Sequence, residues 1–146
     1  METDPSLGVM LRNSCAKWAS KPAMLIPEKK GFKPLSYADL YKVTERYAAA
    51  LTSLGVAKGD RVVILSDNCP EWAFTDWAGQ TLGAVVVPIY PTLPADQAQY
   101  IVKDCGAKLV LAGSLDQVKK VQDMPGVQVL LLRGEQRSEE HTSELQ

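Results

Sequence analysis

Apolar and polar positions alternate along the chain in blocks that predict helices and strands in turn. Between positions 40 and 54, apolar residues recur at helical spacing, which gives the predicted helix one apolar face. Short, largely apolar runs at 62–65, 84–87, 108–112 and 127–132 are typical of strands buried on both faces of a sheet. Helix and buried strand alternate, so the chain is predicted to be α/β, with right-handed crossovers and a parallel sheet covered by helices on both faces.

Capping residues mark where the predicted helices begin. Ser36 and Asp39 have the spacing of a capping box, with Asp in place of the usual Glu, and Ser114 and Gln117 repeat that spacing. Asn68 is predicted to cap a further helix. Each of these positions precedes an apolar stretch of helical period, so helices are expected at all three.

Two of the predicted helices are expected to bury apolar side chains. Aromatic side chains on a helix usually belong to the core, because their burial contributes much of its free energy. The first helix is heavily apolar, with Trp72, Phe74, Trp77 and Leu82. In the second helix, Tyr100, Ile101 and Cys105 are expected to supply an inward stripe.

A proline-bracketed loop follows the predicted strand at 84–87. Pro88 has no N–H to donate, so we expect it to end the strand. Together with Pro91 and Pro94, it makes residues 89–93 a stiff, extended loop.

The loop has two possible roles. Open α/β sheets bind ligands at the carboxyl ends of their strands, which makes residues 89–93 a candidate ligand wall. A proline-rich connection that only fixes the path of the chain would explain the same residues, and short motifs discriminate weakly between the two. In either case, we expect the loop at the carboxyl side of the sheet and Val85 in its interior.

Several motifs resemble one enzyme superfamily. Residues 83–94, GAVVVPIYPTLP, are similar to a motif near the amino end of the AMP-forming adenylating enzymes, which include acyl-CoA synthetases, luciferases and peptide-synthetase adenylation domains. The Tyr-Pro-Thr version most resembles long-chain fatty acid–CoA ligases. Residues 34–40 resemble the opening motif of the family, and 58–66 with 68–72 resemble its first sheet strand and the following turn. The likeness runs from about 33 to 113 in the order and spacing of the family.

The resemblance implies the N-terminal subdomain of the adenylating-enzyme fold, truncated here. Family members join a carboxylate to AMP, expel pyrophosphate and pass the acyl group to coenzyme A, using ATP and Mg²⁺. The Ser/Thr/Gly-rich phosphate loop, the adenine and metal motif, the ribose aspartate and the carboxy-terminal lysine of the family are not in this sequence. We therefore expect the chain alone to be inactive and to bind none of these cofactors. By resemblance, Tyr90, Pro91 and Thr92 would lie near the coenzyme A channel of the parent enzyme.

The chain divides into three predicted parts. Residues 1–32 are expected to form a lead-in helix around Leu11, Cys15 and Trp18 and then a loop, and residues 33–136 a partial AMP-binding domain. Residues 137–146, RSEEHTSELQ, lose the apolar periodicity and match the translation of a widely used DNA-sequencing adapter. We interpret them as an assembly scar and exclude them from fold reasoning.

Charge and composition exclude several classes of function. The 146 residues carry 16 basic and 17 acidic side chains, for a net charge of −1, and no basic cluster suited to nucleic acid. The apolar runs are far shorter than the ~20 residues that span a bilayer, and the acidic start does not resemble a signal peptide. We expect a cytoplasmic protein with small-molecule substrates, for which peripheral membrane contact remains open.

Candidate catalytic or metal-binding side chains are scarce. Cys15, Cys69 and Cys105 are widely spaced, with no pairing typical of zinc or redox sites. The single histidine, His141, falls within the expected scar. We assign no catalytic residue and no metal ligand to this chain.

Two other functions compete with a long-chain fatty acid–CoA ligase. One is another adenylating enzyme, peptide-synthetase or luciferase-like; the peptide-synthetase strand usually runs into an acidic residue where this chain has Tyr90. The other is a small non-catalytic α/β module that binds a partner through its sheet edge, since the length suits a single domain. The order of the matched motifs argues against the module.

Overall fold

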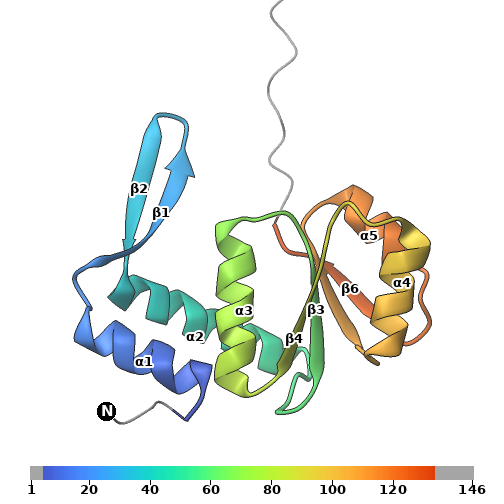
Figure 1. Cartoon of the computed structure of the whole chain (residues 1–146), viewed down its shortest axis with the longest axis horizontal. Coiled ribbons are helices and arrows are strands. Elements are labelled where there is room, and N and C mark those ends of the chain that lie inside the picture. The colour runs from blue at the N-terminus through green and yellow to red at the C-terminus, as the bar shows by residue number, and fades with distance from the viewer. Residues whose placement is uncertain (1–4, 134–146) are drawn as a thin grey trace, which may run out of the picture.

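The computed structural model describes residues 5–133, so the predicted scar at 137–146, with His141, lies outside the described residues. Helices and strands alternate through most of the chain (Figure 1). The elements are α1 (Leu7–Lys17), β1 (Pro22–Glu28), β2 (Gly31–Ser36), α2 (Tyr37–Ser53), β3 (Arg61–Leu65), α3 (Pro70–Leu82), β4 (Val85–Ile89), α4 (Ala95–Asp104), β5 (Leu109–Ala112), α5 (Leu115–Val121) and β6 (Gln128–Leu131).

Four strands form a parallel sheet in the order β4-β3-β5-β6. Every neighbouring pair is parallel, with Val62 opposite both Val86 and Leu109 in the register. The chain therefore crosses over between strands through α3, α4 and α5, as the alternating pattern predicts. The predicted α/β class with a parallel sheet is confirmed.

Helices cover both faces of this sheet (Figure 1). On one face, Val62 and Leu111 pack with Ala78 of α3 and with residues of α2. On the other face, Val63 and Val110 pack with residues of α4 and α5. Val62, Val63 and Val110 have no exposed surface. Successive side chains on a strand point to opposite faces, so the unbroken apolar runs in β3 and β5 follow from this double cover.

The amino end of the chain differs from the prediction. The structure has an antiparallel hairpin, β1 with β2, where a loop was expected after the first helix. Met24, Ile26 and Leu35 from the hairpin pack on a third apolar cluster, which is built around Leu11 and Cys15 of α1 with residues of α2 and α3. Prolines inside both strands weaken the local strand signal, and packing on the helices replaces it. The predicted division at residue 33 is not tested, but it falls inside β2.

Trp18 does not continue the inward stripe of α1. The residue forms the C-cap of that helix and remains 39% exposed. The ammonium groups of Lys21 and Lys17 lie 3.8 Å and 5.0 Å from the centre of its ring. Two cationic side chains thus contact the exposed indole, while Leu11 and Cys15 are buried as predicted.

The prediction of β4 as an interior strand is wrong in two respects. Among the described residues β4 is an edge strand, and Val85 is 50% exposed. Pro88 does not end the strand either, because it pairs with Ile64 in the register and β4 continues to Ile89. An edge strand needs only one row of backbone hydrogen bonds, so proline is tolerated there.

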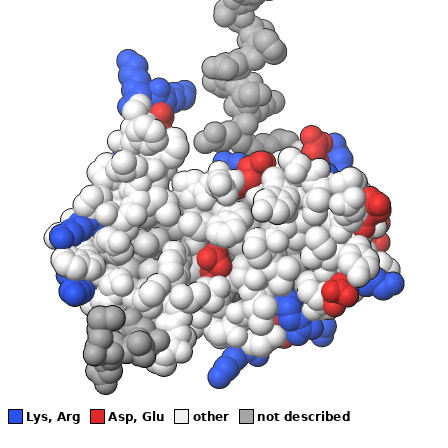
Figure 2. Space-filling model, viewed as in Figure 1, with Lys and Arg blue, Asp and Glu red and all other residues white. Residues whose placement is uncertain are grey.

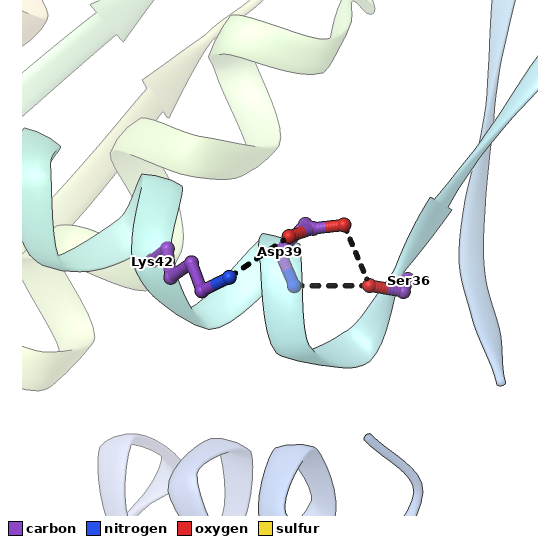
Figure 3. Close-up of polar contacts among 3 residues, drawn as sticks. All are labelled: Ser36, Asp39 and Lys42. Atoms are coloured by element: carbon purple, nitrogen blue, oxygen red, sulfur yellow. Dashed lines mark hydrogen bonds and ion pairs between the residues drawn. The ribbon is translucent and has the colours of Figure 1, made fainter. Parts of the chain in front are cut away.

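Helix caps agree with the sequence at two of three sites. The Ser36 hydroxyl accepts a hydrogen bond from the Asp39 amide at 3.1 Å and donates to the Asp39 carboxylate at 2.8 Å (Figure 3). Lys42 then pairs with that carboxylate at 3.3 Å. At α3 the N-cap is Cys69, not Asn68, because Pro70 already occupies the first helical position.

The predicted inward stripe of α4 needs one correction. Tyr100 is 69% exposed, whereas Ala98 and Val102 are fully buried and Ile101 and Cys105 pack against them. Ala98 and Val102 are four positions apart and so lie on the same face of the helix, which is the buried face. Because Ala98 has a small side chain, it does not stand out as apolar in the sequence. In α3, Phe74 is buried, and Trp72 and Trp77 are half-buried. Phe74 and Trp77 pack with α1, α2 and the hairpin, whereas α3 meets the sheet through Ala78 and Leu82.

Charged side chains are spread over the surface. Figure 2 shows basic side chains at the tip of the β1–β2 hairpin, and basic and acidic side chains interspersed around α4 and α5. The middle of this face is mostly uncharged. The two ion pairs found between residues 5 and 133 are both local pairs on helices, Lys42 with Asp39 and Lys119 with Asp116.

Candidate functional site

The four parallel strands all end on the same side of the sheet, which is uppermost in Figure 1. We call this side the carboxyl edge, as distinct from the edge strand β4. Backbone hydrogen bonds hold these ends together: the Gly113 amide donates to the Leu65 carbonyl at 2.9 Å, and the Leu132 amide to the Ala112 carbonyl at 2.7 Å. The loops that follow the strands therefore lie side by side. This edge is where open α/β sheets place their ligands.

The proline loop lies at this edge, as predicted, but Ile89 belongs to β4 and residues 90–93 form a closed turn instead of an extended loop. Leu93 donates its amide hydrogen to the Tyr90 carbonyl at 3.1 Å, which closes a turn with Pro91 in the second position. Tyr90 is 78% exposed, Pro91 is half-buried and Thr92 is exposed. The three predicted site residues thus lie together on the surface. Their position near a coenzyme A channel stays a prediction.

A cavity of about 470 Å³ lies where this loop runs into α4. Its lining residues are Leu93, Asp96, Gln97, Tyr100 and Ile101. Tyr90, Pro91 and Thr92 line neither this cavity nor the larger cleft described next. Of the turn at residues 90–93, only Leu93 lines the cavity.

A second cleft, of about 820 Å³, opens beyond the carboxyl ends of β5 and β6. Its lining residues are Tyr47, Glu71, Gly113, Ser114, Leu115, Asp116, Lys119, Leu131, Leu132 and Arg133. Sequence reasoning treated these positions as separate helix, cap and strand residues. A usable signal was available, because neighbouring parallel strands end at the same edge and bring their following loops together.

Glu71 is the most unusual side chain in this cleft. Its Oε2 atom is buried and has no hydrogen-bond partner among the described residues. Tyr47 lies nearby, and the pKa of its hydroxyl is raised, first by burial and then by the negative charges of Glu71 and Cys69. A buried carboxylate oxygen without a donor is costly, so Glu71 is available to accept a hydrogen bond from a group that enters the cleft.

Gln117 ties the loops at this edge together. Its side-chain oxygen accepts a hydrogen bond from the Gly113 amide at 2.9 Å, and its side-chain nitrogen donates to the Asp67 carboxylate at 3.1 Å. The Ser114 hydroxyl accepts from the Gln117 amide at 3.3 Å, as the predicted cap requires. The Gln117 side chain therefore reaches one residue past the cap and joins the loops after β3 and β5.

Gly113 is required by this close approach. A β-carbon there would overlap the Ser66 hydroxyl and would lie 3.0 Å from the side-chain oxygen of Gln117. The loops after β3 and β5 are thus closely packed against each other at Gly113.

The described residues do not fit the metal that the family would bring. Between residues 5 and 133, no three histidine, cysteine or acidic side chains lie close enough together to hold a metal ion.

Among residues 5–133, no helix is long and apolar enough to cross a membrane. Cys15 is buried, and Cys69 and Cys105 are half-buried free thiols.

Comparison with known sequences identifies the family. Residues 11–146 match the family model described as AMP-binding enzyme. The chain is 37% identical over 97 residues to the long-chain-fatty-acid--CoA ligase FadD13 of Mycobacterium tuberculosis. The aligned region covers 63% of this chain and 19% of that protein. It is 26% identical over 127 residues to the rat long-chain-fatty-acid--CoA ligase ACSBG1, covering 84% of this chain and 18% of the relative. The chain thus spans about a fifth of the length of these relatives.

Comparison with solved structures gives the same result for the fold. A fatty acyl CoA synthetase from Mycobacterium tuberculosis superposes with a TM-score of 0.79 at 30% sequence identity, over 86% of this chain and 26% of that one. The similarity includes the parallel sheet and its helices, so the predicted N-terminal subdomain of the adenylating-enzyme fold is confirmed. This chain belongs to the AMP-binding enzyme family.

Proposed function

We propose that this chain is the amino-terminal part of a long-chain fatty acid–CoA ligase. Such an enzyme converts a fatty acid, ATP and coenzyme A into acyl-CoA, AMP and pyrophosphate. The observation that carries the proposal is the sequence similarity to long-chain fatty acid–CoA ligases. The Tyr-Pro-Thr turn at residues 90–92, placed at the carboxyl edge of the sheet, adds support.

The chemistry proposed for the parent enzyme requires activation of a poor acyl donor. A carboxylate becomes reactive to a thiol once its oxygen is bonded to the α-phosphorus of ATP with loss of pyrophosphate. Mg²⁺ would stabilise the charge on the phosphates in that step. This chain contributes the scaffold: a covered sheet whose carboxyl edge holds the loops in fixed positions.

We assign Tyr90, Pro91 and Thr92 to the wall of the coenzyme A channel. The turn is closed by the Leu93–Tyr90 hydrogen bond and presents a largely exposed Tyr90. A rigid, exposed turn can line a channel with little entropy lost when a ligand binds. A turn that only fixes the path of the chain is the competing explanation for these three residues.

We propose a cytoplasmic location for the parent enzyme. We also propose that this chain alone is inactive. The sequence contains no Ser/Thr/Gly-rich loop ending in lysine, which the family uses for the ATP phosphates. We therefore expect the 146-residue chain to release no pyrophosphate above a blank when given ATP, Mg²⁺ and a long-chain fatty acid. Turnover by the chain alone would contradict this part of the proposal.

Reading the parent gene past the codon for Gln136 tests the proposal. A ligase predicts a continuous frame with a Ser/Thr/Gly-rich loop ending in lysine. The protein from that frame is expected to form acyl-CoA from long-chain fatty acids. Activity with amino acids in place of fatty acids would instead identify another adenylating enzyme. A stop codon or an unrelated domain would favour a non-catalytic module.

A further inference from the structure

A lysine from another element holds the proline turn from the side of the protein. Lys120 lies on α5, and its Nζ atom donates hydrogen bonds to the Pro91 carbonyl at 2.6 Å and to the Leu93 carbonyl at 2.7 Å. These contacts join positions 29 and 27 residues apart in the sequence. Both carbonyls belong to the turn that we assign to the candidate site.

The end of α5 that carries this lysine is itself anchored. The side-chain nitrogen of Gln99, on α4, donates to the Lys120 carbonyl at 2.6 Å. The α4 and α5 helices also share the apolar cluster on their face of the sheet, where Val102 and Val121 are fully buried. The ammonium group is therefore presented to the turn from a fixed support.

The neighbouring lysine shows that these contacts are not a general property of this helix. Lys119 pairs with Asp116 at 3.0 Å, and its side chain is 68% exposed. Lys120 is half-buried and makes no ion pair with an acidic side chain of residues 5–133. Its charge is directed at two carbonyl oxygens of one turn, and hydrogen bonds from a charged donor are stronger than neutral ones.

We infer that Lys120 is a positioning residue that fixes the turn at residues 90–93. The prolines alone cannot do this, because they restrict φ at Pro91 and Pro94 and the backbone of the residue before each, but leave Thr92 free to rotate. Lys120 holds the carbonyls on both sides of Thr92 and so sets which surface the turn presents. Its role for coenzyme A rests on the proposed function, whereas the fixing of the turn does not.

Amide hydrogen exchange at Leu93, followed by NMR on the full 146-residue chain, tests this inference. The Leu93 amide closes the turn on Tyr90, so it reports directly on opening of the turn. In Lys120→Met, we expect exchange at Leu93 to be faster by on the order of tenfold or more, while amides in β3 and β5 keep their protection. Lys119→Met is the matched control and should leave Leu93 unchanged.

Lys120→Arg separates the charge from simple packing. Arginine keeps a cationic donor, so it is expected to restore at least part of the protection lost in Lys120→Met. Unchanged exchange in Lys120→Met would overturn the inference, as would equal losses throughout the sheet or no recovery with arginine. If the methionine variant does not fold, Lys120→Ala, which also removes the donor, provides the same comparison. The measurement uses no substrate, so its outcome is independent of whether the parent is a ligase.

Discussion

Replacing buried valines by threonine tests whether both faces of the sheet are covered. Val62 and Val110 have no exposed surface and pack on opposite faces, against α2 and α3 in one case and α4 and α5 in the other. Threonine has nearly the shape of valine but brings a hydroxyl group. Burying that hydroxyl without a partner costs about 1–3 kcal/mol in proteins. Val85, at 50% exposure, is the matched control on the same sheet.

The expected changes are large enough to measure by urea unfolding. With a urea dependence of about 2 kcal/mol per molar, Val62→Thr and Val110→Thr should each lower the midpoint by about 0.5–1.5 M. Val85→Thr should change the free energy of unfolding by no more than about 0.5 kcal/mol, because its side chain already meets water. If Val62→Thr or Val110→Thr leaves the midpoint unchanged, the corresponding face is not covered and the reasoning fails.

Three further experiments test the cap of α2, the close packing at Gly113 and the burial of Cys15. Ser36→Ala should lower stability by about 1 kcal/mol in a urea titration, since the α2 cap is lost. In an NMR titration the same change should raise the pKa of Asp39, which is lowered first by the Ser36 hydroxyl and then by Lys42; no rise would contradict this assignment. In the wild type, the stability due to that carboxylate is present above the ordinary carboxyl pKa and is lost as the pH falls through the lowered pKa. Gly113→Ala should cost about 1–3 kcal/mol through overlap with the Ser66 hydroxyl, and a neutral result would show that this edge is loose. Because burial covers Cys15 and raises its pKa, mass spectrometry should find it the last of the three cysteines to be alkylated, and early labelling would refute its burial.

Much of the sheet could be predicted from local pattern. The runs at β3 and β5 are buried on both faces, and such strands leave an unbroken apolar signal. The lateral order of the strands has no comparable signal, and the valines of β4 alone predict an interior strand. Pro88 carried the missing information, because proline inside a strand favours an edge position.

The hairpin and the candidate sites depend on contacts between distant segments. Met24 and Ile26 form a strand face only because helices elsewhere in the chain give them a surface to pack on. The Lys120 contacts with the turn and the unpartnered oxygen of Glu71 likewise follow from how the helices are placed. Periodicity reports on which face of an element is apolar, and it contains no information on which distant residue will reach a given carbonyl.

The most direct test of the proposed ligase follows one oxygen atom. The protein translated from the extended reading frame is incubated with ATP, Mg²⁺, coenzyme A and a long-chain fatty acid whose carboxylate oxygens are ¹⁸O, and AMP and acyl-CoA are analysed by mass spectrometry. Attack of the carboxylate on the α-phosphorus and later loss of AMP to the thiol would leave one ¹⁸O in AMP and one in the acyl-CoA. This is the result that we predict. Acyl-CoA formed without ¹⁸O in AMP, or no acyl-CoA, would contradict the assignment.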